Sequence, residues 1–334
     1  VTVHSFDIKS RVIRQMQLPL DPDGYVPRIT FTNDPLKLLV LTQNRHQNRL
    51  DIYVANPRST ECRLIVRDET EKYISENVYK DFQTTPGGFV LMSERSGWNQ
   101  LYLYDLNGTL KRQLTHGQHV VTDFYGYDSR LGMAYYASNQ EGPLYKAVYK
   151  TDIKGKTIKL SSQKGTNDAI FSSGLRYYMN VWSNLQTPPV TTLCDANGKT
   201  LGTLEDNSEL RSKLSGIAMG ERRIISFKTQ DGVQLNGLMV LPADFKESRK
   251  YPVILFQYSG PGSQQVLDSW SAGNMGGMLY EQYLAQQGFI SLVVDGRGTG
   301  GRGRDFEQCT YLKLGQLESH DQVEAALYAA SLPY

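Results

Sequence analysis

Tyr258 is the residue whose type and position most clearly suggest chemistry. It follows a nearly continuous apolar run, Pro252 to Gln257, and opens the turn Tyr258-Ser259-Gly260-Pro261-Gly262. Buried strands of parallel sheets have such apolar runs, and ligands meet open α/β sheets at the carboxyl ends of strands. A phenol there can donate a hydrogen bond to an oxyanion, and the glycines let the backbone approach a substrate. The alternative is a buried tyrosine whose hydroxyl binds a neighbouring carbonyl.

A glycine- and arginine-rich segment follows the next apolar strand, which we expect at Phe289 to Val294. Its run Gly296-Arg297-Gly298-Thr299-Gly300-Gly301 formally fits G-x-G-x-x-G. A dinucleotide fingerprint leads directly into a helix that holds the pyrophosphate, whereas Arg302 to Leu314 is polar and irregular. We therefore favour a flexible loop between a strand and a helix over a nucleotide site.

The sequence contains no Gly-x-Ser-x-Gly, the motif that carries the nucleophile of many serine hydrolases. His320 is the histidine of the C-terminal part, and without such a serine we expect it to be a solvated residue at a helix end. Ser319 and Gln322 predict a capping box that opens this helix. Glu318 and Asp321 are expected to stabilise the helix N-terminus through its dipole.

Residues 1 to about 215 predict short strands joined by turns, with hardly any helix. Pairs of apolar strands recur with a period of about 45 to 50 residues, which is typical of a four-stranded propeller blade. The pairs are 38–41 with 49–54, 89–92 with 100–105, 133–136 with 145–149, and 177–180 with 190–193. About four to five blades fit into this region.

The pattern changes near residue 219. A hairpin around Asp231-Gly232 comes first, followed by a buried strand, a helix at Met278 to Gln287, a second buried strand and a final helix. Alternating strands and helices predict an α/β layer with parallel strands. The sequence therefore predicts propeller blades over residues 1–218 and an α/β domain over residues 219–334.

Composition excludes several classes of function. The formal net charge is +2, with 36 basic and 34 acidic residues, so the chain offers no field suited to nucleic acid or an anionic membrane. It has no apolar run long enough to span a bilayer. The cysteines Cys62, Cys194 and Cys309 are odd in number and widely separated, and no H-E-x-x-H motif or cysteine pair suggests zinc. We expect neither a metal nor a cofactor.

These segments together resemble the dipeptidyl peptidase IV family of prolyl-oligopeptidase-type serine peptidases, and its bacterial members in particular. The segments that carry the resemblance are 250–255, 258–264, 294–303, 314–318 and 321–322 in the C-terminal part, with 47–51 and 93–105 in the propeller region. The resemblance implies the C-terminal part of a β-propeller with four-stranded blades, followed by the N-terminal part of an α/β-hydrolase domain. It also implies that the chain is one part of a longer protein.

The resemblance further implies a serine exopeptidase that releases Xaa-Pro or Xaa-Ala dipeptides from peptide N-termini. Tyr258 matches the family's side-chain oxyanion donor. The Ser, Asp and His of the triad and the amine-binding glutamates are expected outside these residues, so the chain alone is expected to be inactive. A homodimer and an exported or periplasmic bacterial location are implied as well.

Two alternatives remain open. The chain could be a non-catalytic interaction module built from a propeller and a hydrolase-like half, or part of an oligopeptidase or acylaminoacyl peptidase of the same clan.

Overall fold

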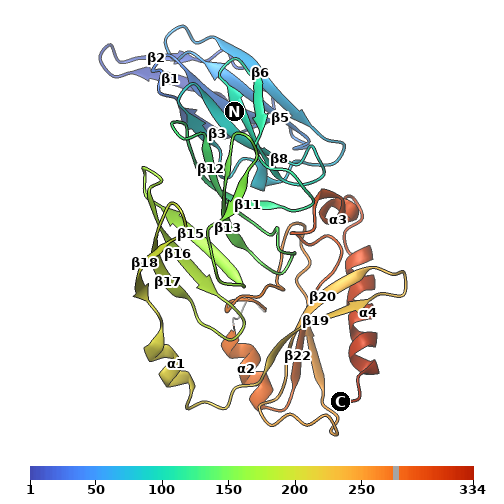
Figure 1. Cartoon of the computed structure of the whole chain (residues 1–334). Coiled ribbons are helices and arrows are strands. Elements are labelled where there is room, and N and C mark those ends of the chain that lie inside the picture. The colour runs from blue at the N-terminus through green and yellow to red at the C-terminus, as the bar shows by residue number, and fades with distance from the viewer. Residues whose placement is uncertain (274–277) are drawn as a thin grey trace. The chain divides into compact units, whose positions relative to one another are not determined.

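The computed structural model describes residues 1–273 and 278–334, and its first two thirds consist of sheets (Figure 1). A hairpin, β1 (His4–Asp7) with β2 (Val12–Gln15), precedes four four-stranded sheets. The first two contain β3 (Tyr25–Phe31), β4 (Leu38–Gln43), β5 (Arg49–Ala55) and β6 (Cys62–Glu69), then β7 (Gln83–Thr85), β8 (Gly88–Ser93), β9 (Gln100–Asp105) and β10 (Leu110–Gln113). The next two contain β11 (Val121–Asp128), β12 (Met133–Ser138), β13 (Ala147–Asp152) and β14 (Thr157–Lys159), then β15 (Thr166–Phe171), β16 (Tyr177–Ser183), β17 (Val190–Asp195) and β18 (Thr200–Glu205).

The chain divides into two compact units. One consists of residues 1–136 and 150–158, and the other of residues 137–149 and 159–334.

The middle strands of the first three sheets are their most buried ones, as expected for blades covered on both faces. Strands β4, β5, β8 and β9 are almost entirely buried, whereas the last strand, β10, is largely exposed. One core cluster joins the first two sheets: Leu39, Leu41 and Ile52 pack with Phe89 and Tyr104, whose rings stack. Each large apolar side chain buried in this way contributes about 1.5–3 kcal/mol.

The strand pairs predicted from the repeat are confirmed, since they coincide with β4–β5, β8–β9, β12–β13 and β16–β17. The blade count of about four to five agrees with the four sheets. The prediction of hardly any helix is confirmed for residues 1–215, where α1 (Ser208–Leu214) after β18 is the α-helix. A short 3-10 turn, η1 (Glu76–Val78), precedes β7.

The C-terminal part is a mixed sheet of order β19-β20-β22-β21. Its strands are β19 (Arg222–Lys228), β20 (Gln234–Val240), β21 (Val253–Phe256) and β22 (Ile290–Asp295). The predicted hairpin is β19–β20, and the predicted parallel pair is β21–β22. The hairpin joins the sheet through β20, which pairs with β22 in the antiparallel direction. The prediction that β21 is a buried strand is wrong, because β21 is an edge strand and its residues are half-buried or exposed.

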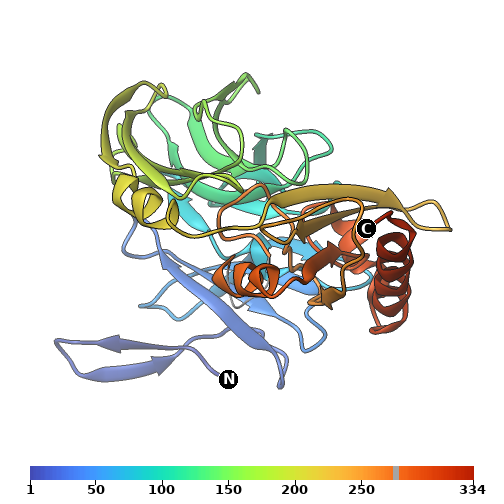
Figure 2. The same ribbon diagram turned by 90° about the horizontal axis from the view of Figure 1, so that it is seen from below.

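Helices lie on both faces of this sheet, as Figures 1 and 2 show for α2 (Met278–Gln286) and α4 (Gln316–Ser331). Ala325 and Ala329 of α4 pack on Leu292 and Val294 of β22. On the other face, Val293 packs with loop residues that include Val266. Between β22 and α4 lie the short helix α3 (Arg304–Glu307) and the 3-10 turn η2 (Gln308–Thr310).

The predicted capping box of Ser319 and Gln322 is wrong, because the N-cap of α4 is Gly315, four residues earlier, and the helix begins at Gln316. Gly315 precedes the helix with φ = 88°, a left-handed conformation that favours glycine. Its N–H donates to Glu318 Oε2 at 2.9 Å. The expected role of Glu318 at the helix N-terminus is therefore confirmed.

Leu292→Ala tests whether β22 is the centre of the C-terminal core. Leu292 is fully buried, so we expect the free energy of unfolding to fall by about 2–5 kcal/mol because a cavity remains. Leu279→Ala on α2 is the matched control, since that side chain is 66% exposed and its loss should cost less than about 0.5 kcal/mol. Chemical denaturation measures both variants. Equal losses would contradict the placement of the core.

Candidate active site

Tyr258 lies just beyond the carboxyl end of β21, next to the parallel strand β22. Its side chain is 46% exposed, and its hydroxyl has no hydrogen-bond partner among the described residues. A side chain at Gly260 would begin 3.8 Å from the ring, so the backbone passes close beneath the phenol. The alternative, a buried tyrosine whose hydroxyl binds a neighbouring carbonyl, is therefore wrong. The catalytic role itself stays a prediction.

The turn that follows Tyr258 is fastened to the loop that follows β22. Gly262 N donates to Gly298 O at 3.1 Å, and Gly300 N donates to Ser263 O at 2.8 Å. A Cβ atom on Gly300 would lie 2.6 Å from Gly262 O, closer than real Cβ contacts. Gly262 has φ = +74°. The glycines of both segments thus allow two turns to pack backbone against backbone.

Asp295, the last residue of β22, adds a second anchor. One carboxylate oxygen accepts the N–H of Gln265 and the other accepts the N–H of Val266, each at 2.9 Å. The side chain is buried. Burial raises the pKa of Asp295 to about 6, although both hydrogen bonds and the charge of Arg302 act in the opposite direction. Sequence reasoning missed this residue, because its partners are backbone groups thirty positions away.

Arg297 fixes the same loop from its other side. Its guanidinium makes hydrogen bonds to both carboxylate oxygens of Asp321 and a further one to Asp231 Oδ2 at 2.7 Å. Asp321 is completely buried, so helix stabilisation alone is the wrong explanation for it. His320 lies within α4, partly exposed, and its Nδ1 accepts a hydrogen bond from Arg297 at 3.1 Å. The guanidinium of Arg297 is therefore paired with the carboxylates of Asp321 and Asp231, which leaves it unavailable to bind a phosphate.

The glycine- and arginine-rich segment is a strand-to-helix connection, as predicted, but it is anchored by these contacts. The helix after it, α3, has only four residues, which is unlike the helix of a dinucleotide fingerprint.

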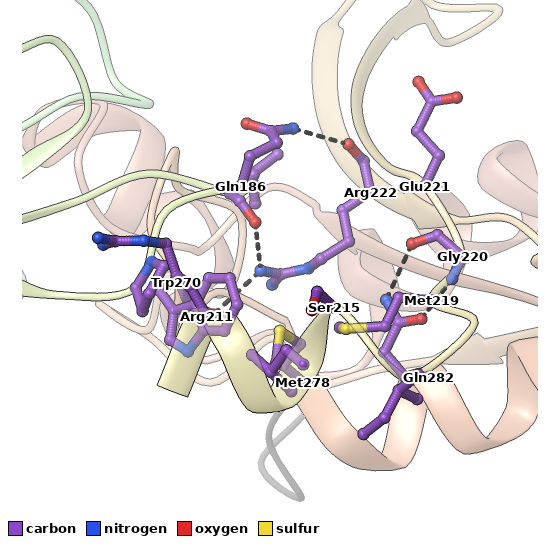
Figure 3. A pocket seen from close by; sticks show the side chains of 14 residues that line it. Gln186, Arg211, Ser215, Met219, Gly220, Glu221, Arg222, Trp270, Met278 and Gln282 are labelled. Atoms are coloured by element: carbon purple, nitrogen blue, oxygen red, sulfur yellow. Dashed lines mark hydrogen bonds between the residues drawn. The ribbon is translucent and has the colours of Figure 1, made fainter. Parts of the chain in front are cut away.

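A separate cavity of about 420 Å³ lies between α1, α2 and the start of β19 (Figure 3). Arg222 lines it and is buried, and its guanidinium donates to the carbonyl oxygens of Leu185, Trp270 and Ala272. Its Nε atom has no partner among the described residues, but protein atoms also cover it. Its donors therefore hold neighbouring loops together. The sequence did not predict this cavity, because Arg222 binds backbone carbonyl groups and belongs to no motif.

Within residues 1–273 and 278–334, no three His, Cys, Asp or Glu side chains are grouped so that they could hold a metal ion. In the same residues, no helix combines the length and the apolar character that crossing a membrane requires.

Comparison with known proteins identifies relatives for both parts. The family model "Dipeptidyl peptidase IV (DPP IV) N-terminal region" matches residues 1–189, and the model "Prolyl oligopeptidase family" matches residues 278–334. A probable dipeptidyl peptidase 4 of Aspergillus flavus is 26% identical over 353 aligned positions, covering 100% of this chain and 45% of the relative. One from Emericella nidulans is 28% identical and covers 93% of this chain and 41% of the relative.

Two solved structures are similar over nearly the whole chain. The crystal structure of Porphyromonas gingivalis dipeptidyl peptidase 4 has a TM-score of 0.95 and 42% identity, covering 100% of this chain and 47% of that one. A putative dipeptidyl aminopeptidase IV from Bacteroides ovatus has a TM-score of 0.87 and 25% identity, covering 98% and 49%. The chain thus spans somewhat less than half the length of these relatives. Since a single family model covers more than half of its residues, the chain belongs to the dipeptidyl peptidase IV family.

Proposed function

We propose that this chain is part of a serine exopeptidase that releases Xaa-Pro or Xaa-Ala dipeptides from peptide N-termini. The observation that carries the proposal is the Tyr258 phenol, which is accessible and unpartnered at the carboxyl end of a parallel strand. The names of the relatives, dipeptidyl peptidase 4, support the type of peptidase. The preference for Pro or Ala rests on the family resemblance.

Tyr258 would act on the tetrahedral intermediate. Attack on the scissile carbonyl turns its oxygen into an oxyanion, and a phenol already placed there stabilises the developing charge without reorganisation. One such donor is typically worth about 3 kcal/mol in the transition state. The 334 residues contain no Gly-x-Ser-x-Gly, so we expect the nucleophile outside them and residues 1–334 by themselves to be inactive.

We also propose that residues 219–334 form the N-terminal part of an α/β-hydrolase domain, after propeller blades in residues 1–218. The parallel pair β21–β22, helices on both faces of the sheet and the family match at residues 278–334 support this division. A homodimer and an exported location stay predictions of the resemblance.

A non-catalytic interaction module is the second candidate. A same-clan oligopeptidase or acylaminoacyl peptidase is the third. The experiments below use the full-length gene product and distinguish among the three.

Replacing the phenol tests the oxyanion assignment. We expect Tyr258→Phe to lower kcat for an Ala-Pro anilide by about 10²- to 10³-fold, because the donor to the oxyanion is lost. Tyr283→Phe is the matched control, since Tyr283 is an exposed tyrosine on α2 and its variant should keep the kcat of the parent. A Tyr258→Phe enzyme with unchanged turnover would remove the assignment.

Blocking the substrate amine tests the exopeptidase assignment. We expect hydrolysis of free Ala-Pro anilide to exceed that of its N-acetyl form, because a dipeptidyl peptidase recognises the charged amine. Measuring kcat/KM for both substrates decides the matter. Preference for the acetylated substrate would exclude a dipeptidyl peptidase and favour an oligopeptidase of the same clan, and no hydrolysis of either would favour an interaction module.

A further inference from the structure

We propose that the ionised carboxylate of Asp295 is a positioning residue for Tyr258, holding the turn that carries the phenol at the distance that oxyanion binding requires. This inference rests on the proposed function. The hydrogen bonds of Asp295 go to the backbone N–H groups of Gln265 and Val266 and not to the phenol, so its effect would pass through the backbone of residues 258–266.

The geometry at Asp295 requires two acceptors. Its two oxygens each accept one N–H from consecutive residues, Gln265 and Val266, at the same distance of 2.9 Å. An ionised carboxylate is the side chain that presents two acceptors side by side, whereas an amide presents one acceptor and one donor. An Asn at this position would therefore set an NH₂ group against one of the two backbone N–H groups.

The anchored segment leads directly to the phenol. Val266 is fully buried, which fixes the far end of the turn. Nearer to Tyr258, the backbone bonds of Gly262 and Ser263 go to Gly298 and Gly300, which follow Asp295 in the chain. Residues 262–266 are thus held by hydrogen bonds to the end of β22 and to the loop after it.

The Tyr258 side chain has no anchor of its own. Because its hydroxyl is unpartnered among the described residues, the position of the ring depends on the backbone turn. The neighbouring Ser259 is buried, and its Oγ accepts only a long hydrogen bond, 3.4 Å, from Gln322. A displacement of about 1 Å at a reacting group can cost about 10²-fold in rate, so a fixed turn matters.

The charge of Asp295 is held at a cost to stability. The side chain is 6% exposed, and Arg302 is the charged residue whose field lowers its pKa. The folded pKa, about 6, lies above the ordinary value of about 3.9. The contribution of Asp295 to stability is therefore fully present below about pH 4 and is lost as the pH rises through about 6. At neutral pH, above this pKa, the carboxylate is ionised although burial penalises its charge, and such perturbed groups are typical of functional sites.

Asp295→Asn tests the proposal in the full-length enzyme. We expect kcat to fall by about 10- to 100-fold with little change in KM, because the phenol is displaced in the transition state. In a Tyr258→Phe background, Asp295→Asn should cause no further loss of kcat. A loss of the same factor in both backgrounds would overturn the proposal and leave the oxyanion assignment intact. A Tyr258→Phe enzyme with full activity would overturn both.

Asp268→Asn is the matched control. Asp268 lies in the same loop and accepts a backbone hydrogen bond from Leu185 N at 3.0 Å, away from the Tyr258 turn. Its variant should keep kcat within about twofold. If Asp295→Asn does not fold, Gly300→Ala replaces it, because a methyl group 2.6 Å from Gly262 O displaces the same turn. Its loss of kcat should likewise vanish in the Tyr258→Phe background, and a multiplicative loss would overturn the proposal.

The pH profile separates positioning from a general structural defect. The ratio of wild-type kcat to Asp295→Asn kcat should be small near pH 5, where wild-type Asp295 is mostly protonated, and should rise to its full value near pH 8. The titration of a catalytic histidine cancels in this ratio, because both enzymes share it. A ratio that stays constant across this range would contradict the role of the ionised carboxylate.

Discussion

The hydrogen bonds from two consecutive backbone N–H groups to the carboxylate of Asp295 are the interaction on which the candidate site depends. These bonds connect the end of β22 to the segment that follows the tyrosine turn. A buried charge needs compensation, and here backbone dipoles supply it together with the more distant Arg302.

Close backbone packing explains the glycines that first suggested a phosphate site. Gly300 passes so near Gly262 that any side chain would collide with the opposite carbonyl. Arg297 in this loop also binds the buried Asp321 of α4. A glycine-rich sequence between a strand and a helix can thus allow two loops to pack closely, and it need not bind a ligand. The carboxylate partners of Arg297 indicate the packing role here.

Elements with strong periodicity could be predicted from the sequence. Strands β4, β8 and β22 are apolar on both faces, so their burial is visible in the residue types. Strand β21 has the same apolar character but lies at the edge of its sheet, where its residues are half-buried or exposed. Helix α1 was missed because it is seven residues long and buries none of them, which leaves no amphipathic pattern. The start of α4 was misplaced because Ser319 and Gln322 mimic a capping box, while the true cap is a backbone N–H bound to Glu318.

The site was predictable only where a side chain carries the chemistry. The phenol of Tyr258 follows an apolar strand and can be recognised by its place. The role of Asp295 cannot be recognised in this way, because its partners are N–H groups that every residue except proline possesses. Asp321 was likewise assigned to its own helix because its partner, Arg297, is distant in sequence.

The central claim is that the phenol of Tyr258 meets the oxyanion of a peptide bond under attack. The most direct test is a crystal structure of the full-length protein with a peptidyl boronate bound as a tetrahedral adduct. We expect the Tyr258 hydroxyl to lie about 2.7–3.1 Å from the adduct's oxyanion oxygen. A ring turned away from the adduct, with its hydroxyl bonded to another protein group, would contradict the claim.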